Sequence, residues 1–299
     1  MESTSDNTIS QHEIDLLPSR WSKRYNADKV VENFIELFQE VLNDVRSKTK
    51  YLLDVPYGDT NRTKMDIYGI DLPNDAPIFV YIHGGYWIEL TKDSASFAVP
   101  VLVARGIKVI CLGYDLCPNV KLADIVAQIK SGVERILADA VTSGSRCVWV
   151  GGHSAGAHLA ATLIHDDVWL KRIASKGYDQ LLKGIALFGG VYDISPLQTV
   201  SFNELLQLTE DEIKAYSLSK LDATNEMPIE GIKVILAVAG YEAPILKEQS
   251  VSYAMKLLTL VDHVEYIMLP KHDHFDLSED LRKPDYILTR LLIQNILHL

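Results

Sequence analysis

Short apolar runs that alternate with helical stretches constrain the fold of this chain most strongly. Several runs show no polar alternation, which is typical of strands covered on both faces. The helical stretches between the later runs predict a mostly parallel sheet with helices on both faces, an α/β class of fold. The early runs have no helix between them, so we expect the sheet to begin with antiparallel strands. The runs span 51–55, 65–68, 78–82, 107–112, 147–150, 185–188, 234–238 and 264–269, and the helical stretches span 26–45, 122–140, 155–173, 250–260 and 286–297.

The 299 residues suit one large domain. Residues 1–20 are expected to form a flexible N-terminal arm, and 21–299 a single α/β domain without internal repeats. Residues 192–232 interrupt the alternation with short helical signals and no strand. A small helical cap over the end of the sheet is one interpretation, and a long connection that only covers core is the other.

Charge and cysteine content narrow the partners and the compartment. The chain has 29 basic and 40 acidic residues, a net charge of −11, which argues against nucleic acid or an anionic membrane as a partner. It has no apolar run long enough for a membrane span, and its first residues do not resemble a secretory signal. The odd cysteine count, Cys111, Cys117 and Cys147, favours buried free thiols in the cytoplasm, with the nucleus still open.

A G-x-S-x-G motif lies between the apolar run 147–150 and an alanine-rich helical stretch. It comprises Gly152, His153, Ser154, Ala155 and Gly156. Such a strand–turn–helix context is what a nucleophilic serine requires, because the tight turn exposes its hydroxyl at the carboxyl end of the sheet. The alternative, a glycine-rich turn that only packs a strand on a helix, does not explain the signals elsewhere in the chain.

A second glycine motif follows the apolar run 78–82. It reads His83-Gly84-Gly85-Tyr86-Trp87. Paired glycines at a strand end can turn backbone N–H groups toward a developing oxyanion. We therefore expect Gly84, Gly85 and Ala155 to form an oxyanion hole.

The general base should be a histidine late in the chain. His274 is preferred over His272, because Phe275 can anchor the loop and turn the His274 imidazole inward. A third hypothesis for this segment is a zinc site formed by His272, Asp273, His274 and Asp276, but no second cluster of ligands in the sequence supports it.

The acid that orients this histidine should follow a strand between the serine and the histidine. Glu242 comes just after the run 234–238 and gives the chain order Ser154, Glu242, His274. Asp193 and Asp262 compete for this role and fit the expected position less well.

Together these motifs resemble the kynurenine formamidases, or arylformamidases, of the hormone-sensitive-lipase-like branch of α/β hydrolases. The resemblance extends to Asp273-His274-Phe275-Asp276, to Tyr241-Glu242-Ala243-Pro244 and to Pro18-Ser19-Arg20-Trp21-Ser22. The family often has aspartate where this chain has Glu242. The resemblance implies an α/β-hydrolase fold and a serine hydrolase that cleaves N-formyl-L-kynurenine to L-kynurenine and formate in tryptophan catabolism.

The implied reaction uses no metal and no organic cofactor, and its partner is a small-molecule arylformamide. Tyr86, Trp87 and Tyr192 are candidates for stacking on the aryl ring. Two other functions stay open: a small-acyl carboxylesterase, and a ligand-binding protein on an inactive hydrolase fold. The sequence does not fix the oligomeric state, so a homodimer is open too.

Overall fold

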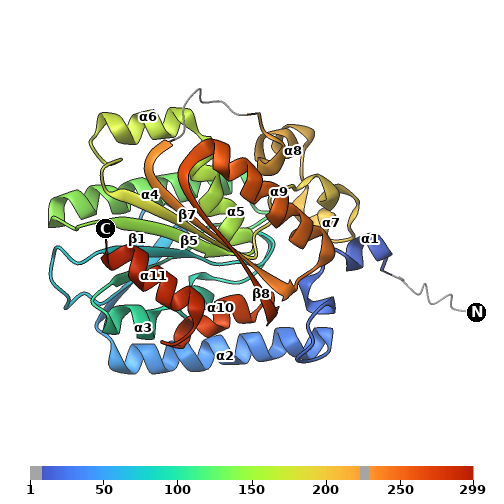
Figure 1. The fold of residues 1–299 in the computed structure, drawn as a ribbon, viewed down its shortest axis with the longest axis horizontal. Helices are drawn as coiled ribbons and strands as arrows, with labels where there is room; N and C mark the ends of the chain where they lie inside the picture. The colour runs from blue at the N-terminus through green and yellow to red at the C-terminus, as the bar shows by residue number, and fades with distance from the viewer. Residues whose placement is uncertain (1–8, 223–228, 299) are drawn as a thin grey trace, which may run out of the picture.

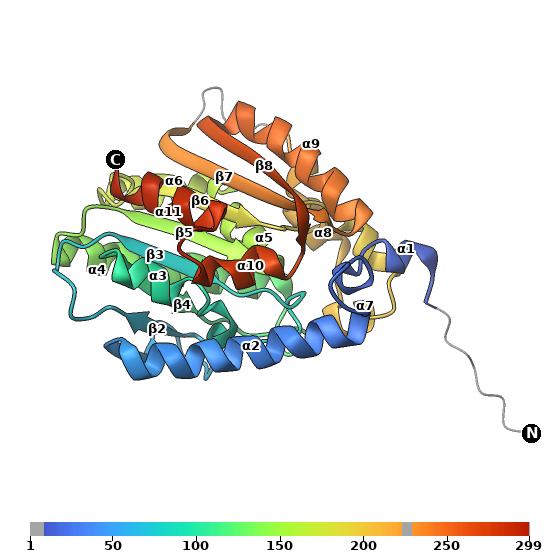
Figure 2. The same cartoon turned by 60° about the horizontal axis from the view of Figure 1, so that its bottom comes forward.

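The structure, a computed structural model, describes residues 9–222 and 229–298. In this part of the chain, eight strands form one sheet in the order β1-β2-β4-β3-β5-β6-β7-β8 (Figures 1 and 2). They are β1 (Tyr51–Pro56), β2 (Lys64–Tyr68), β3 (Ile78–Ile82), β4 (Lys108–Leu112), β5 (Val148–His153), β6 (Leu182–Phe188), β7 (Ile229–Tyr241) and β8 (Val261–Asp273).

The pairing of the strands confirms the predicted fold class. β2 pairs antiparallel with both β1 and β4, while β4, β3, β5, β6, β7 and β8 pair in parallel. The carboxyl ends of the parallel strands therefore meet along one edge of the sheet, where ligands bind in open α/β folds.

Helices cover both faces of the sheet (Figures 1 and 2). One layer contains α2 (Ala27–Lys48), α3 (Val99–Ala104), α10 (Asp276–Glu279) and α11 (Ile287–Leu297), and the other contains α4 (Leu122–Ser143), α5 (Ala155–Thr162), α6 (Asp167–Ser175) and α9 (Pro244–Leu260). Short 3-10 turns, η2 (Lys92–Ala95), η3 (Leu163–His165) and η6 (Asp280–Arg282), join some of them.

Successive side chains of a strand point to opposite faces of the sheet, so a strand with helices on both sides needs apolar residues at every position. In β3, Phe79 and Tyr81 join the core cluster under α2, α3 and α11, whereas Val80 points into the cluster under α4, α5 and α9. These three side chains are 0% exposed. Burial of each contributes about 1.5–3 kcal/mol, so the continuous apolar runs specify strands between two helical layers.

One predicted helix and the last two predicted strands differ from the structure. The single helix expected over 155–173 is broken into α5, η3 and α6, because Asp166 accepts a hydrogen bond from the backbone N–H of Trp169 and so starts a new helix. The last two strands are longer than the apolar runs, since β7 and β8 continue to pair where polar residues such as Lys233 and His263 face outward.

The predicted cap region forms short helices in its described part. These are η4 (Ser195–Thr199), α7 (Asn203–Leu206), α8 (Glu210–Tyr216) and η5 (Leu218–Lys220), while residues 223–228 of the predicted insertion lie outside the described residues. Both views place α7 close to α1 (Gln11–Ile14), beyond one end of the sheet (Figures 1 and 2).

The N-terminal segment from residue 9 onward runs over the same end of the molecule. It contains α1 and η1 (Pro18–Arg20), and Leu16 between them is fully buried. Glu13 accepts hydrogen bonds from the backbone N–H and the hydroxyl of Ser201 at 2.9 and 2.5 Å. The remainder of the predicted arm, residues 1–8, lies outside the described residues.

The three cysteines are free and buried, as the sequence predicted. Burial raises the pKa of Cys117 and of Cys147 to about 11, so these thiols are poor nucleophiles at neutral pH. Among residues 9–222 and 229–298, no helix is long and apolar enough to cross a membrane.

Candidate active site

Ser154 occupies a strained turn at the carboxyl end of the central strand β5. Its backbone angles are φ 56° and ψ −121°, and α5 begins at the next residue. A non-glycine residue in this conformation costs about 1–3 kcal/mol, and such strain concentrates at functional sites. The backbone N–H of Ser154 donates to the carbonyl of Phe188 at 2.8 Å, which fixes the turn to the neighbouring strand β6.

Two glycines make this turn possible because backbone atoms approach them closely. A Cβ on Gly156 would lie 2.1 Å from the carbonyl oxygen of Ile82, and a Cβ on Gly152 would lie 2.3 Å from the carbonyl carbon of Gly156. Neither obstacle is a side chain that could move aside. The motif glycines therefore allow α5 to pack against the end of β3 directly behind Ser154.

His274 and Glu242 form a buried pair that comes from the ends of β8 and β7. His274 Nδ1 and Glu242 Oε2 are 2.8 Å apart, and their side chains are 4% and 0% exposed. The other carboxylate oxygen of Glu242 accepts from the backbone N–H of Ala243 at 2.9 Å. Glutamate thus reaches the imidazole where the family often has aspartate. Because Glu242 pairs with Nδ1, the other ring nitrogen of His274, Nε2, is available to accept a proton.

Ser154 and His274 line one pocket of about 140 Å³. His274 is held from behind, because Nε2–H of His153 donates to its backbone carbonyl at 2.7 Å. In the described part of the chain, no hydrogen bond joins the Ser154 hydroxyl to His274. Such bonds are often long until a substrate binds, so the arrangement is compatible with a nucleophile and its base.

The other candidates for base and acid lie elsewhere. His272 faces Asp280 at 3.8 Å and does not line the pocket. Asp193 forms an ion pair with Lys220 at 2.7 Å, and Asp262 lies near the start of β8, at the opposite end of that strand from His274. Of the predicted alternatives, the structure brings only Glu242 to His274.

The loop after β3 carries Gly84 and Gly85, which the sequence predicts as oxyanion donors. Gly85 has φ +99°, and a Cβ there would lie 2.4 Å from the carbonyl oxygen of Glu89. A Cβ on Gly84 would lie 3.1 Å from Cβ of Ser154, so this loop runs beside the predicted nucleophile. Ala155 opens α5, where first-turn N–H groups have no partner within the helix.

The motif histidines support this loop from inside the protein. Burial lowers the pKa of His83 to about 3, so its ring is neutral and donates from Nδ1 to the carbonyl of Gly84 at 2.8 Å. The ring also stacks on Tyr114, whose hydroxyl donates to the carbonyls of His83 and Gly84. His158 is neutral as well, since burial lowers its pKa to about 4, and its Nε2 donates to the carbonyl of Tyr216 at the end of α8 in the cap region.

The predicted aromatic residues have different positions. Tyr86 lines the pocket and its hydroxyl donates to the carbonyl of Leu16. Trp87 and Tyr192 are 0% exposed and belong to the core. Trp87 packs edge-on against His158, and Tyr192 stacks on Tyr253, so neither is among the described residues that line the pocket.

Sequence reasoning missed the N-terminal and α2 residues of the pocket. Leu17, Pro18 and Ser19 form part of its wall, together with Phe34 and Ile35 of α2. These residues lie far along the chain from the hydrolase motifs, so no local pattern links them to the site. The one available signal was that Pro18-Ser19 belongs to the N-terminal stretch of the family resemblance. Glu89 and Leu90, which follow the double-glycine motif, also line the pocket.

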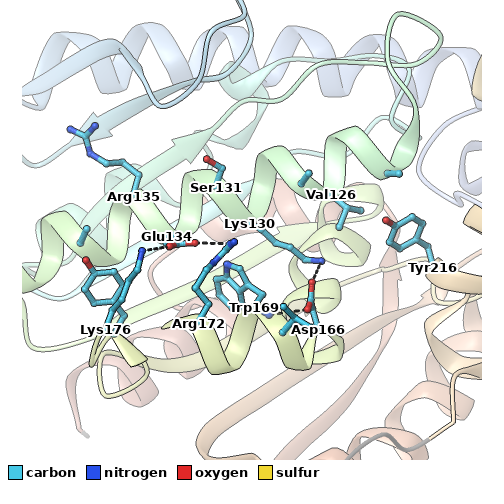
Figure 3. Close-up of a pocket in the computed structure, with 15 residues that line it drawn as sticks. Val126, Lys130, Ser131, Glu134, Arg135, Asp166, Trp169, Arg172, Lys176 and Tyr216 are labelled. Carbon is cyan, nitrogen blue, oxygen red and sulfur yellow. Dashed lines mark hydrogen bonds and ion pairs between the residues drawn. The ribbon is translucent and has the colours of Figure 1, made fainter. Parts of the chain in front are cut away.

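A larger groove of about 750 Å³ lies between α4 and α6, away from Ser154 and His274 (Figure 3). Its charges pair with one another: Lys130 binds Asp166 at 2.5 Å, and Glu134 binds both Arg172 and Lys176 at 2.7 Å (Figure 3). Among the described residues of this groove, both carboxylates, Glu134 and Asp166, are therefore held in ion pairs. Over the described residues, no group of three or more His, Cys, Asp or Glu side chains is arranged to hold a metal ion.

A family model and solved structures of other proteins are similar to this chain. Residues 79–276 match the family model Abhydrolase_3, the alpha/beta hydrolase fold, so the chain belongs to the α/β hydrolases. A solved structure from Silicibacter sp. tm1040 has a TM-score of 0.73 and 24% identity, and the match covers 95% of this chain and 99% of that chain.

The full-length relatives define the family more narrowly. The chain is 32% identical to the kynurenine formamidase of Danio rerio over 97% of each chain, and 32% identical to that of Salmo salar over 98% of each chain. The chain therefore belongs to the kynurenine formamidase family, which confirms the resemblance inferred from its motifs.

Proposed function

We propose that this protein is an arylformamidase that hydrolyses N-formyl-L-kynurenine to L-kynurenine and formate, a step of tryptophan catabolism. The observation that carries the proposal is the buried His274–Glu242 pair, 2.8 Å apart, in the pocket that Ser154 also lines. The full-length kynurenine formamidase relatives support the choice of a formamide as the substrate. Reduced thiols favour the cytoplasm as its compartment.

In the acylation step, His274 Nε2 takes the proton of the Ser154 hydroxyl as its oxygen attacks the formyl carbon. Glu242 holds Nδ1–H and stabilises the imidazolium that forms. The N–H groups of Gly84, Gly85 and Ala155 bind the oxyanion, and one such donor contributes about 3 kcal/mol to transition-state stabilisation.

Collapse of the tetrahedral intermediate breaks the C–N bond, and His274 gives its proton to the leaving arylamine. A water molecule then attacks the formyl-serine ester while His274 takes one of its protons. The bond between the formyl carbon and the Ser154 oxygen breaks, His274 returns the proton to that oxygen, and formate leaves. All proton transfers use groups of the protein, so this mechanism draws on no metal or organic cofactor. A formyl group is the smallest acyl group, which suits a pocket of about 140 Å³.

The test is turnover of N-formyl-L-kynurenine by the purified protein beside a short-chain nitrophenyl ester. We expect a far higher kcat/KM on the formamide, and loss of both activities in Ser154→Ala. Ser175→Ala, an exposed serine at the end of α6, is the matched control. Full activity of Ser154→Ala would refute the mechanism, and turnover of the ester alone would make the protein a carboxylesterase.

A further inference from the structure

Glu89 is held beside the oxyanion loop by an unusual turn. The backbone N–H groups of Ile88 and Glu89 both donate to the carbonyl of Gly85, at 2.9 and 3.1 Å. Cγ of Glu89 lies 3.0 Å from the place a Gly85 Cβ would occupy. The Glu89 side chain therefore starts next to the loop that faces Ser154.

Backbone strain and a hydrogen bond from an arginine indicate that the turn over residues 85–90 is held in one conformation. Tyr86, Trp87 and Leu90 all have positive φ, at 45°, 61° and 69°. Non-glycine residues in this region cost free energy unless the surroundings hold them there. Arg62 supplies such a hold, because its guanidinium donates to the carbonyl of Leu90 at 2.6 Å.

Glu89 brings an uncompensated negative charge to a mostly apolar pocket. The lining includes Leu17, Pro18, Phe34, Ile35, Leu90 and Phe275, and none of its described residues is a lysine or an arginine. Within the described part of the chain, no hydrogen bond or ion pair satisfies the Glu89 carboxylate. Glu89 is an exposed residue at the edge of this pocket, and partial desolvation of its carboxylate still raises its pKa. A bound cation would offset that cost.

We propose that Glu89 binds an ammonium group of the substrate, so that the site selects arylformamides with a cationic side chain. This inference rests on the proposed function, since N-formyl-L-kynurenine carries an α-ammonium group as well as an α-carboxylate. Because none of the described residues that line the pocket is a lysine or an arginine, the substrate carboxylate has no equivalent partner among them. The amine is therefore the recognised charge, and the carboxylate is dispensable.

The test compares three formamides that share the formamidophenyl ketone and differ in the charged groups of the side chain. They are N-formyl-L-kynurenine, its analogue that lacks the carboxylate but keeps the amine, and 2-formamidoacetophenone, which has neither group. For the wild type we expect both amines to exceed the neutral compound in kcat/KM. In Glu89→Gln, the ratio of each amine to the neutral compound should fall about 10- to 100-fold, the effect of losing one charge-assisted hydrogen bond.

Glu36→Gln is the matched control, because Glu36 is an exposed glutamate on α2, next to the pocket residue Ile35. It removes the same charge and should leave the ratio unchanged. An unchanged ratio in Glu89→Gln, or an equal fall in Glu36→Gln, would overturn the role of Glu89 while formamide turnover leaves the proposed function intact. Wild-type protein that hydrolyses none of the three formamides would instead overturn the proposed function itself.

Discussion

Replacement of Arg24 by alanine should impair both stability and turnover. Arg24 follows the N-terminal segment of the pocket wall and binds Asp273, the residue before His274. Its guanidinium donates two hydrogen bonds to Asp273, at 2.8 and 2.9 Å, and two to Glu279, at 2.6 and 3.3 Å. Asp273 also accepts from Ser22 and from two backbone N–H groups of its own loop, so Arg24 fixes the loop that carries the base.

The magnitude follows from the burial of the carboxylates. The side chains of Asp273 and Glu279 are 0% and 4% exposed, whereas that of Arg24 is 32% exposed. Removing one partner of a buried ion pair costs about 3–5 kcal/mol, and the partial exposure of Arg24 favours the lower end of that range. About 3 kcal/mol corresponds to a fall in Tm of roughly 5 °C for a domain of this size, because its entropy of unfolding is about 0.6 kcal/mol/K.

Turnover should fall through kcat more than through KM, because Arg24 does not line the pocket. A small displacement of a catalytic group can cost about 100-fold in rate, so we expect a loss of about 10- to 100-fold. The assays are thermal unfolding and formamide turnover with and without added guanidinium, which should restore part of kcat. Lys23→Ala, an exposed neighbour, is the control. If Arg24→Ala matched Lys23→Ala in both Tm and kcat, the reasoning would be refuted.

Two further predictions concern the same end of the sheet. Glu242→Ala should lower kcat by about 10³- to 10⁴-fold and leave a weak residual activity, since the imidazole loses its orientation while the oxyanion hole remains; an activity loss of less than tenfold would exclude Glu242 as the orienting acid. Burial and then the charge of Asp273 raise the pKa of Asp276 to about 8, above the value near 3.9 of an unfolded chain. The folded state therefore binds more protons between about pH 4 and pH 8, and this part of the unfolding free energy is lost as pH rises through that window, at up to about 1.4 kcal/mol per pH unit. Urea unfolding at pH 6 and pH 9 should show a smaller loss of stability for Asp276→Asn than for the wild type, and equal losses would contradict this assignment.

The hydrolase motifs could be read from the sequence because they depend on local backbone geometry. Ser154 requires glycines at fixed distances along the chain, since Gly152 and Gly156 approach backbone atoms so closely that a Cβ would collide with them. The strands were recognisable for a similar reason, because a two-layer cover demands continuous apolar runs. Where a strand is partly exposed, as β8 is, polar residues conceal its ends, and the predicted strand was too short.

Contacts between distant segments could not be read in this way. The sequence identified Glu242 and His274 as candidates, but only the meeting of β7 and β8 at one edge of the sheet brings them to 2.8 Å. Trp87 and Tyr192 were candidates for the pocket by residue type, yet the packing of the core encloses both side chains.

The sequence by itself determined the class of fold and the family and predicted the nucleophile, because each depends on residue types at short, fixed spacings. The tertiary structure alone decided which walls enclose the pocket. Pro18 and Phe34 reach Ser154 across more than a hundred residues of chain, and Arg24 reaches Asp273 from the other terminus. Such contacts depend on how helices and loops pack after the sheet has formed, and no local pattern encodes them.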